Sequence, residues 1–484
     1  EDLYGRYEIT EDGRTVCSGN LEDLKLEAQA SKVITLPDIP ATKVPGAEYF
    51  INFSFCQKRD TEWAKADYEV ATEQFKLSSS EKPIFVPEKG NINLNETADA
   101  LVVKGERFEA VFSKEEGTLS AYTLNNIPLI SKGLELNLFR APTDNDKQVS
   151  GDWQRKGLYQ LQAETGKWET HQEEDRITLH IRNCHKGKLG FEYRTEIEYT
   201  VNADGSIMVN SVIPVSDSEI IPRVGYRMEL PEGFERMRWY GRGPWENYVD
   251  RKDATPIGVY ESTVSDQWVN YVKPQEMGNH EEVRWISITN ADGMGFVFVA
   301  GDQMAASALH VRAQDMADPD HLQKLIHKYD IPMRKETVLC LDAHNRPLGN
   351  ASCGPGPMKK YELQATPVAF SFIMMPLERS YTQSELTKKA RVQMPACMPV
   401  MVERDNNGYL QMSTGTPDAT IFYSLNGNEY REYTAPFEFI DGGKIQTYAV
   451  SGKLGKSLVT TMELPIFVDH SAWKVGSSSS DSQG

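Results

Sequence analysis

The sequence predicts an all-β protein of several domains, and three observations support this prediction. Short runs of alternating apolar and polar residues recur along most of the chain, separated by turn sequences such as Asn202-Ala-Asp-Gly205. Hardly any segment shows the longer apolar period of a helix. At 484 residues the chain also exceeds the roughly 250–300 residues that one hydrophobic core usually serves. We therefore expect two to four β-domains in series.

Composition and net charge exclude several classes of protein. With 39% hydrophobic and 25% charged residues, the chain has the composition of a soluble globular protein. None of its apolar runs approaches the roughly 18 residues that a membrane span needs. The net charge of −18 opposes binding to nucleic acid and to anionic membrane surfaces, and it suits neutral ligands such as sugars. The sequence therefore predicts neither a nucleic-acid-binding protein nor a membrane protein.

The cysteines give no sign of a metal or redox site. Six of them are scattered along the chain without the close pairs of a zinc site or a redox motif. We therefore expect buried thiols, no metal site and no cofactor.

Residues 1–80 are expected to form an immunoglobulin-like β-sandwich. Alternating runs at Tyr7–Thr10, Val33–Leu36, Tyr49–Gln57 and Ala71–Leu77 favour antiparallel strands joined by hairpins. Barely one run precedes the first turn, so the first strands of such a sandwich are expected to be missing. This domain is therefore predicted to be truncated at its amino end.

Residues 91–380 follow a linker rich in serine, proline and glycine, and they are expected to form one large antiparallel sandwich. So many strands in about 290 residues, with hardly a long helix, favour two stacked sheets. The runs that predict these strands are Leu101–Phe112, Gly117–Leu124, Ile177–Ile181, Tyr193–Val201, Ser206–Val215, Trp285–Ala300 and Tyr361–Met374.

Residues 395–468 are expected to form a third, small β-sandwich. Its strands are predicted at Val400–Val402, Leu410–Ser413, Thr420–Leu425, Phe437–Phe439 and Ile445–Val450. The final segment, 469–484, contains a serine run, and we expect it to be a disordered tail or linker.

The stretch Trp239–Arg251 has the composition of a sugar-binding loop. Aromatic faces stack on the apolar side of a pyranose, carboxylates and amides bind its hydroxyls, and glycine and proline hold an irregular loop in one shape. A structural corner is the alternative, in which Arg242 or Arg251 pairs with Glu246 or Asp250. Residue types alone do not decide between the two.

Three motifs, in order, resemble those of glycoside hydrolase family two β-galactosidases. Gly241–Arg251 resembles the Gly-x-Gly-Pro-x-Glu-Asn-Tyr-x-Asp-Arg signature of their last domain, and Leu138–Asp146 and Tyr271–Gly278 match two further segments. The resemblance covers about residues 1–380. It implies an immunoglobulin-like domain followed by a galactose-mutarotase-like supersandwich, and it implies that the family's first domain here begins some tens of residues earlier. The third domain is similar to a carboxyl-terminal domain of chitobiases and many secreted glycosidases.

The resemblance implies hydrolysis of terminal β-D-galactosides with retention of configuration. That reaction needs two carboxyl groups about 5–5.5 Å apart. In this family both lie on an eight-stranded α/β barrel of about 250 residues. No segment of this chain shows the alternating strand and helix pattern of a barrel. We expect no catalytic residue here and an inactive chain when it is alone.

The site residues that we predict are candidates for binding carbohydrate or for lining the wall of the sugar pocket. They are Arg140, Asp144, Asn145, Asp146, Trp245, Glu246, Asn247, Arg251, Glu276 and Cys353.

The acidic segment Asp144–Asp146 has two alternative interpretations. It orients a mobile loop at the mouth of the barrel, as the resemblance implies, or it is a turn held by Asx hydrogen bonds. A calcium site is disfavoured because the glycine and the distal glutamate of an EF-hand are missing.

Cys353 marks a departure from the family. Family members carry a sugar-stacking tryptophan in a Ser-Trp-x-Pro segment, whereas this chain reads Ser352-Cys353-Gly354-Pro355. Cysteine offers no stacking face, so Trp245 or Trp153 takes over or the aglycone site differs.

The function we expect is therefore that of the non-catalytic carboxyl-terminal region of a β-galactosidase. Its partners would be a galactoside and the catalytic barrel, with homo-oligomerisation left open, and its location would be the periplasm or the outside of the cell. Two alternatives remain, an independent carbohydrate-binding module and an aldose 1-epimerase-like enzyme. The epimerase would need an acid and a base such as Glu276 and His280.

Overall fold

The computed structural model describes residues 2–22, 24–27, 29–36, 44–213, 220–318, 326–363, 367–405 and 407–468. The segment 469–484, for which we predicted a disordered tail, lies outside the described residues. Contacts divide the chain into two compact units. The first comprises Glu1–Ser211, Ile220–Leu363 and Phe370–Pro395, and the second comprises Val212–Glu219, Gln364–Ala369 and Ala396–Gly484.

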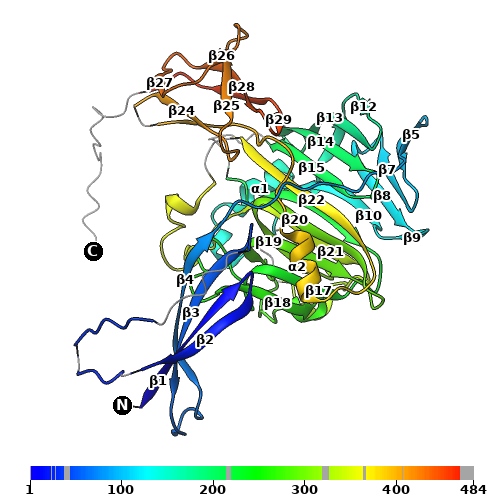
Figure 1. Ribbon diagram of the computed structural model, residues 1–484. Helices are drawn as coiled ribbons and strands as arrows, with labels where there is room; N and C mark the ends of the chain where they lie inside the picture. Colours follow the sequence, from blue (N-terminus) through cyan, green and yellow to red (C-terminus); the bar gives the residue numbers. More distant parts are fainter. Residues whose placement is uncertain are drawn as a thin grey trace. The chain divides into compact units, whose positions relative to one another are not determined.

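The described residues before position 80 form one antiparallel four-stranded sheet in the order β2-β1-β3-β4 (Figure 1). Tyr7, Ile9 and Ile51 form the buried side of this sheet. The strand predicted at Val33–Leu36 is wrong, because this run is irregular and Val33 is 93% exposed, with no neighbouring strand to pair with among the described residues. The four strands are β1 (Leu3–Glu11), β2 (Arg14–Leu21), β3 (Glu48–Gln57) and β4 (Glu69–Ser79).

A five-stranded antiparallel sheet follows in simple sequential order. This sheet packs so closely against β10 (Lys132–Asn137), the strand that follows it, that Gly133 on β10 has no room for a side chain. A Cβ there would lie 2.2 Å from the carbonyl oxygen of Leu119. The strands are β5 (Asn93–Glu96), β6 (Ala100–Lys104), β7 (Phe108–Ser113), β8 (Thr118–Leu124) and β9 (Ile127–Pro128).

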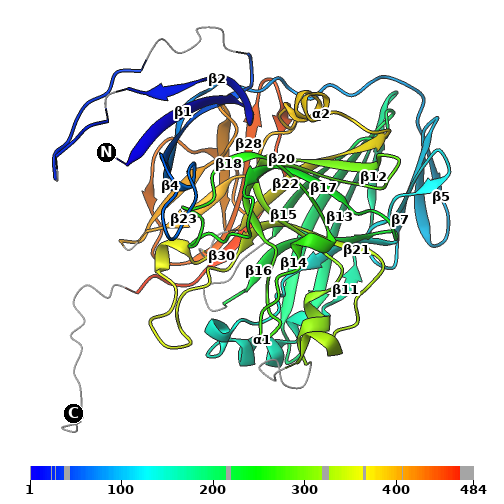
Figure 2. The same ribbon diagram turned by 90° about the horizontal axis from the view of Figure 1, so that it is seen from below.

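A thirteen-stranded sheet is the largest element of the first unit (Figure 2). Its main path runs through β10 (Lys132–Asn137), β16 (Arg223–Leu230), β21 (Thr337–Asn345), β20 (Met294–Leu309), β22 (Val368–Glu378), β15 (Ile207–Ile213), β14 (Glu192–Asn202), β13 (Arg176–Lys186) and β11 (Gln162–Thr165). Off this path, β12 (Glu169–Gln172) pairs with β13, while β17 (Arg236–Arg242), β18 (Ile257–Thr263) and β19 (His280–Thr289) form a branch on β20.

Apolar periodicity explains where these strands lie. In β13 the buried residues Ile177, Leu179 and Ile181 alternate with more exposed ones, as expected of a strand with one face on the core. In β20 the run Phe296–Val299 is buried without alternation, because this central strand is covered on both faces. The prediction of an all-β, multi-domain fold is confirmed.

The helices are short. They are α1 (Ser150–Lys156), α2 (Gln383–Ala390) and the 3-10 turns η1 (Asp144–Asp146), η2 (Leu158–Gln160), η3 (Ser265–Gln267), η4 (Ala313–Met316), η5 (Lys328–Asp330) and η6 (Lys359–Tyr361). In α1, Trp153 is fully buried and its Nε1 donates to the carbonyl of Ile220, just before β16. A helix with the length and apolar character to span a membrane is absent from the described part of the chain.

The second unit contains a three-stranded and a five-stranded antiparallel sheet around its own core. Val402, Leu410, Ile445 and Ala449 are fully buried in that core. The strands are β23 (Met401–Arg404), β24 (Tyr409–Ser413), β25 (Thr420–Leu425), β26 (Arg431–Glu432), β27 (Phe437–Glu438), β28 (Gly443–Ser451), β29 (Gly455–Lys456) and β30 (Thr460–Leu464).

The cysteines differ from the expectation of six buried thiols. All six are free, but Cys353 is exposed, because it lies in an irregular loop where no strand covers it. Cys56, Cys340 and Cys397 are buried, and Cys17 and Cys184 are half-buried.

Candidate functional site

The three motif segments meet at one end of the large sheet. The segment 138–146 leaves β10 and enters η1, 241–251 leaves β17, and 271–278 leads into β19. The backbone N–H of Glu276 donates to the carbonyl of Ala141 over 3.1 Å. The backbone N–H of Gly278 donates to Glu246 Oε2 over 2.8 Å. Hydrogen bonds thus join the third motif to both of the others.

A hollow of about 200 Å³ lies where the three segments converge. Four predicted site residues, Asp144, Asn145, Arg251 and Glu276, line it. The remaining lining residues are Thr143, Tyr248, Tyr271, Gln275, Leu348 and Ser352. The hollow therefore combines carboxylate, amide, guanidinium and phenol groups within one small space.

Glu246 does not line the hollow itself, but it binds two residues that do. Its Oε1 accepts hydrogen bonds from Tyr271 Oη and, over 2.8 Å, from Arg251 Nη2. Since Gly278 N–H occupies Oε2, both carboxylate oxygens have partners within the protein. Glu246 thus fixes two lining side chains rather than offering a free carboxylate.

The corner that we considered as an alternative is partly present. Arg251 pairs with Glu246, as that interpretation expects, whereas Arg242 pairs with Glu282 over 2.9 Å. Asp250 accepts from the backbone N–H groups of Leu348 and Gly349, so it anchors the loop that carries Cys353.

A buried ion pair joins Arg140 to Asp146, and neither residue lines the hollow. Both side chains are fully buried, and Arg140 Nη2 lies 2.8 Å from Asp146 Oδ1. Arg346 Nη1 donates to the same oxygen over 2.9 Å, and Thr143 donates to Oδ2 through its N–H and its hydroxyl. Burial alone would raise the pKa of Asp146, but the two guanidinium groups hold it below its ordinary value. Asp146 is therefore a structural anion.

Glu276 connects the hollow to a second buried network. Its Oε1 accepts from Arg223 Nη2 over 2.7 Å and from Asn345 Nδ2 over 3.2 Å. Arg223 Nε also lies 3.1 Å from Asp342 Oδ2, so one guanidinium faces two carboxyl groups. Burial raises the pKa of Asp342 to about 8. The positive charge of Arg223 lowers this pKa, but the negative charge of Glu276 raises it further. Glu276 is thus fixed in position by a cation behind it.

Asn247 joins the second motif, 241–251, to the residues at the start of β19. Its N–H donates to the carbonyl of Asn279 over 2.7 Å, and its Oδ1 accepts from the N–H of Glu281 over 2.8 Å. Asn247 is fully buried, so it does not contact a ligand in the hollow directly. Burial also raises the pKa of Glu281 to about 7.

Two predicted residues are exposed outside the hollow. The side chain of Trp245 is 68% exposed, so its ring is available for stacking. Cys353 is exposed on a loop to which Asn145 binds through the N–H of Ser352 over 2.9 Å. The other aromatic that we considered for stacking, Trp153, is excluded because it is fully buried in α1.

Comparison with known proteins identifies the family. Residues 104–374, more than half of the chain, match the family described as beta galactosidase small chain. This chain belongs to that family. Residues 1–78 in addition match the family described as beta-galactosidase, domain 4. The recognition that we drew from the three motifs is therefore confirmed, and the chain is a β-galactosidase-associated region.

The curated relatives of this chain are named β-galactosidases. The chain is 30% identical over 285 residues to one from Priestia megaterium, covering 57% of this chain and 27% of the relative. It is 26% identical over 375 residues to one from Actinobacillus pleuropneumoniae, covering 76% of this chain and 35% of the relative. The chain thus spans about a third or less of the length of these relatives.

Among solved structures, an aldose epimerase homologue from C. elegans covers 60% of this chain and 100% of its own. The identity is 9% and the TM-score 0.29, which is too low to support an argument about fold or function.

Sequence reasoning missed several of the residues that line the hollow. Tyr248, Tyr271 and Gln275 lie inside the quoted motifs, but their residue types gave no reason to single them out. Leu348 and Ser352 belong to a loop that carries no carboxylate or aromatic signal. Lys273 was also missed, although its Nζ lies 3.1 Å from Asp144 Oδ1.

The described residues contain no group of three His, Cys, Asp or Glu side chains placed to hold a metal ion. In the segment that we weighed for calcium, Arg140, Arg346 and Thr143 already occupy the oxygens of Asp146.

Proposed function

We propose that this chain is the non-catalytic region of a retaining β-galactosidase and that it completes one wall of the sugar pocket. The observation that supports the proposal is the convergence of three motif loops on one hollow. At about 200 Å³ the hollow is smaller than the roughly 300–1,000 Å³ of a typical complete ligand pocket. A partial pocket of this size fits a wall that another domain closes.

The parent enzyme would hydrolyse terminal β-D-galactosides, and the catalytic barrel would supply both reacting carboxyl groups. The two acids that line the hollow suit neither role. Glu276 is bound to Arg223 and Asn345, and Asp144 is paired with Lys273. We therefore propose that the chain is inactive by itself.

The proposed partners are a galactoside and the catalytic barrel, and the proposal includes no cofactor for this chain. Its net charge of −18 disfavours nucleic acid and anionic membranes as partners. We place the protein in the periplasm or outside the cell, because the sequence of residues 395–468 resembles domains of secreted glycosidases. Homo-oligomerisation is compatible with this function.

One observation favours an independent carbohydrate-binding module as the second candidate. The side chain of Trp245 is 68% exposed, so a sugar could stack on its ring without a barrel. No such observation favours an epimerase. His280 is fully buried between Trp239 and Gln267, with its Nε2 2.7 Å from Gln267 Oε1, and burial lowers its pKa to about 4.

Hydrolysis of a nitrophenyl β-D-galactoside tests the wall function. The chain alone should be inactive, whereas the barrel-bearing polypeptide should gain activity when this chain is present. Trp245→Ala should lower kcat/KM about tenfold, equivalent to about 1.4 kcal/mol of transition-state binding. Trp63→Ala is the matched control, because Trp63 is similarly exposed at 66%. Hydrolysis by the chain alone, or equal effects of both variants, would contradict the proposal.

A further inference from the structure

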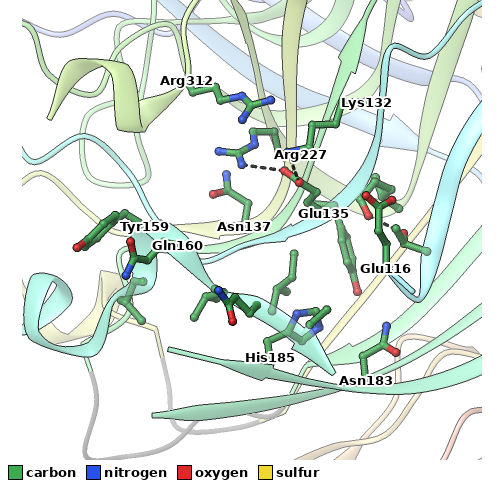
Figure 3. Close-up of a pocket in the computed structure, with 18 of the residues that line it drawn as sticks. Glu116, Lys132, Glu135, Asn137, Tyr159, Gln160, Asn183, His185, Arg227 and Arg312 are labelled. Carbon is green, nitrogen blue, oxygen red and sulfur yellow. Dashed lines mark hydrogen bonds and ion pairs between the residues drawn. The ribbon is translucent and has the colours of Figure 1, made fainter. Parts of the chain in front are cut away.

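A second cavity, of about 460 Å³, lies in the first unit and shares no lining residue with the hollow (Figure 3). Its walls come from β10 and β16 on one side and from β14, β13 and β11 on the other. These strands lie at opposite ends of the main path of the thirteen-stranded sheet. The sheet therefore curls until its two ends face each other across the cavity.

Strand register shows which side chains point toward this cavity. Asn183 and His185 are two positions apart on β13, so they share one face of the strand. Ala163 on β11 is paired with His185 and therefore lies on the same face. Figure 3 shows Asn183 and His185 on one side of the cavity, and Arg227 and Arg312 across from them.

The formal charges of the lining side chains sum to zero, and Arg312 has its partner outside the lining, in Glu229. The lining contains three acidic and three basic residues: Glu115, Glu116, Glu135, Lys132, Arg227 and Arg312. Glu135 lies 2.5 Å from Lys132 Nζ and 2.8 Å from Arg227 Nη2. Burial alone would raise the pKa of Glu135, but these two cations lower it. The cavity therefore carries no excess charge of either sign.

The polar groups are also held in fixed positions. Arg227 Nη1 donates to Gln314 Oε1 over 2.8 Å, and Gln314 Nε2 donates to the carbonyl of Tyr159 over 3.0 Å. His185 Nε2 lies 3.0 Å from Thr195 Oγ1, and burial lowers the pKa of His185 to about 4, so the ring is neutral near pH 7. Polar groups fixed before binding lose little freedom when a ligand arrives.

Apolar surface completes the lining. Leu136, Leu158 and Ile197 line the cavity together with the ring of Tyr159. Tyr159 is half-buried and forms a T-shaped pair with Phe139, with ring centroids 6.0 Å apart, while Lys188 Nζ lies 5.2 Å from the centroid of the Tyr159 ring. A mixture of apolar surface with a few fixed donors and acceptors is typical of small-molecule sites.

We propose that this cavity is a second binding site, for a neutral saccharide of one or two rings. A sugar offers many hydroxyl groups and no charge, which matches a lining that is polar but electrically balanced. Its apolar face can pack on Tyr159 and the leucines. The volume lies within the roughly 300–1,000 Å³ of typical ligand sites. This inference goes beyond the proposed wall function and does not depend on it.

Saturation-transfer NMR of the purified chain with galactose, glucose and lactose tests this site. We expect transfer to at least one of these neutral sugars. Ala163→Trp should abolish it by filling the cavity, whereas Ala163→Ser should retain it. Gln160→Ala should weaken binding by up to about tenfold through the loss of one exposed polar contact. The charged analogue galacturonate should compete poorly, because its carboxylate would disturb the charge balance.

Controls separate this cavity from the hollow. Trp63→Ala, at a similarly exposed tryptophan that lines neither the cavity nor the hollow, should leave the transfer unchanged, and circular dichroism should show that Ala163→Trp is folded. If Ala163→Trp fails to fold, the Gln160→Ala titration decides, and an unchanged affinity overturns the proposal. Transfer to none of the three sugars, or transfer lost in Trp245→Ala but kept in Ala163→Trp, also overturns it. Either failure leaves the galactoside hydrolysis experiment unaffected.

Discussion

The side chain of Asp146 shows how much one buried charge contributes to the candidate site. It is fully buried and forms ion pairs with both Arg140 and Arg346. Asp146→Asn would leave Arg140 without its carboxylate partner and Arg346 with Glu362 alone. Removing one partner of a buried ion pair typically costs about 3–5 kcal/mol. We expect a loss of this size in the free energy of unfolding, measured by urea denaturation.

Asp144→Asn is the matched control for that measurement. Asp144 lies in the same 3-10 turn, but its side chain is 64% exposed and pairs with Lys273. Exposed ion pairs contribute about 0–1 kcal/mol, so this variant should unfold at nearly the wild-type midpoint. Equal shifts for both variants would show that Asp146 is not the anchor that its contacts indicate.

Asp342 gives a second prediction at the scale of one residue, about pH. Its carboxyl oxygens accept no hydrogen bond from any described residue, and burial raises its pKa to about 8. An unfolded chain releases this proton near pH 4, at about the ordinary aspartate pKa of 3.9. Folding therefore takes up a proton between these values. The Asp342 contribution to stability is fully present below pH 4 and is lost as pH rises to 8, by at most about 1.4 kcal/mol per pH unit.

Asp342→Asn removes this titration while keeping the size of the side chain. We expect the difference in unfolding free energy between wild type and variant to shift in favour of the variant from pH 5 to pH 8. Titrating groups that do not interact with Asp342 act equally in both proteins and cancel in the difference. The charge of Glu281 raises the pKa of Asp342, so the titration of Glu281 contributes to the difference as well. A difference that stays constant with pH would mean that Asp342 is ionised in the folded state throughout this range.

At the scale of elements, local pattern predicted the strands whose partners are adjacent. The alternation in β13 and the turn Asn202-Ala-Asp-Gly205 between β14 and β15 give clear signals, because each depends on residues close in sequence. Val33–Leu36 also has residues typical of a strand but pairs with no described strand, and composition alone does not reveal that. Gly133 is similar, since its need for glycine comes from the backbone of Leu119 on another strand.

The candidate site was predictable to the extent that its residues lie in compact motifs. Asp144, Arg251 and Glu276 come from three motifs, and the loops that carry them meet at one hollow. Their contacts were not predictable, because Arg223 and Asn345 reach Glu276 from strands distant in sequence. The larger cavity left no sequence signal, since curling of the sheet brings single residues from many elements together.

At the scale of the whole molecule, the two units have separate hydrophobic cores. Leu410 is fully buried among Val402, Phe439 and Ile445 in the second unit. Leu179 is fully buried on β13 in the first unit. A chain of several domains need not unfold in one two-state step. Separate cores predict two transitions in differential scanning calorimetry.

Leu410→Ala should lower the melting temperature of one transition and leave the other in place. Truncation of a buried leucine typically costs about 2–5 kcal/mol, because it removes packed methyl groups and leaves a cavity. For a unit of about 100 residues, each kcal/mol lowers Tm by roughly 4–8 °C, so the shift should be easily resolved. The reciprocal variant, Leu179→Ala, should move the other transition. If either substitution shifts both transitions together, the two units unfold as one cooperative structure, and the separate cores do not act as separate thermodynamic units.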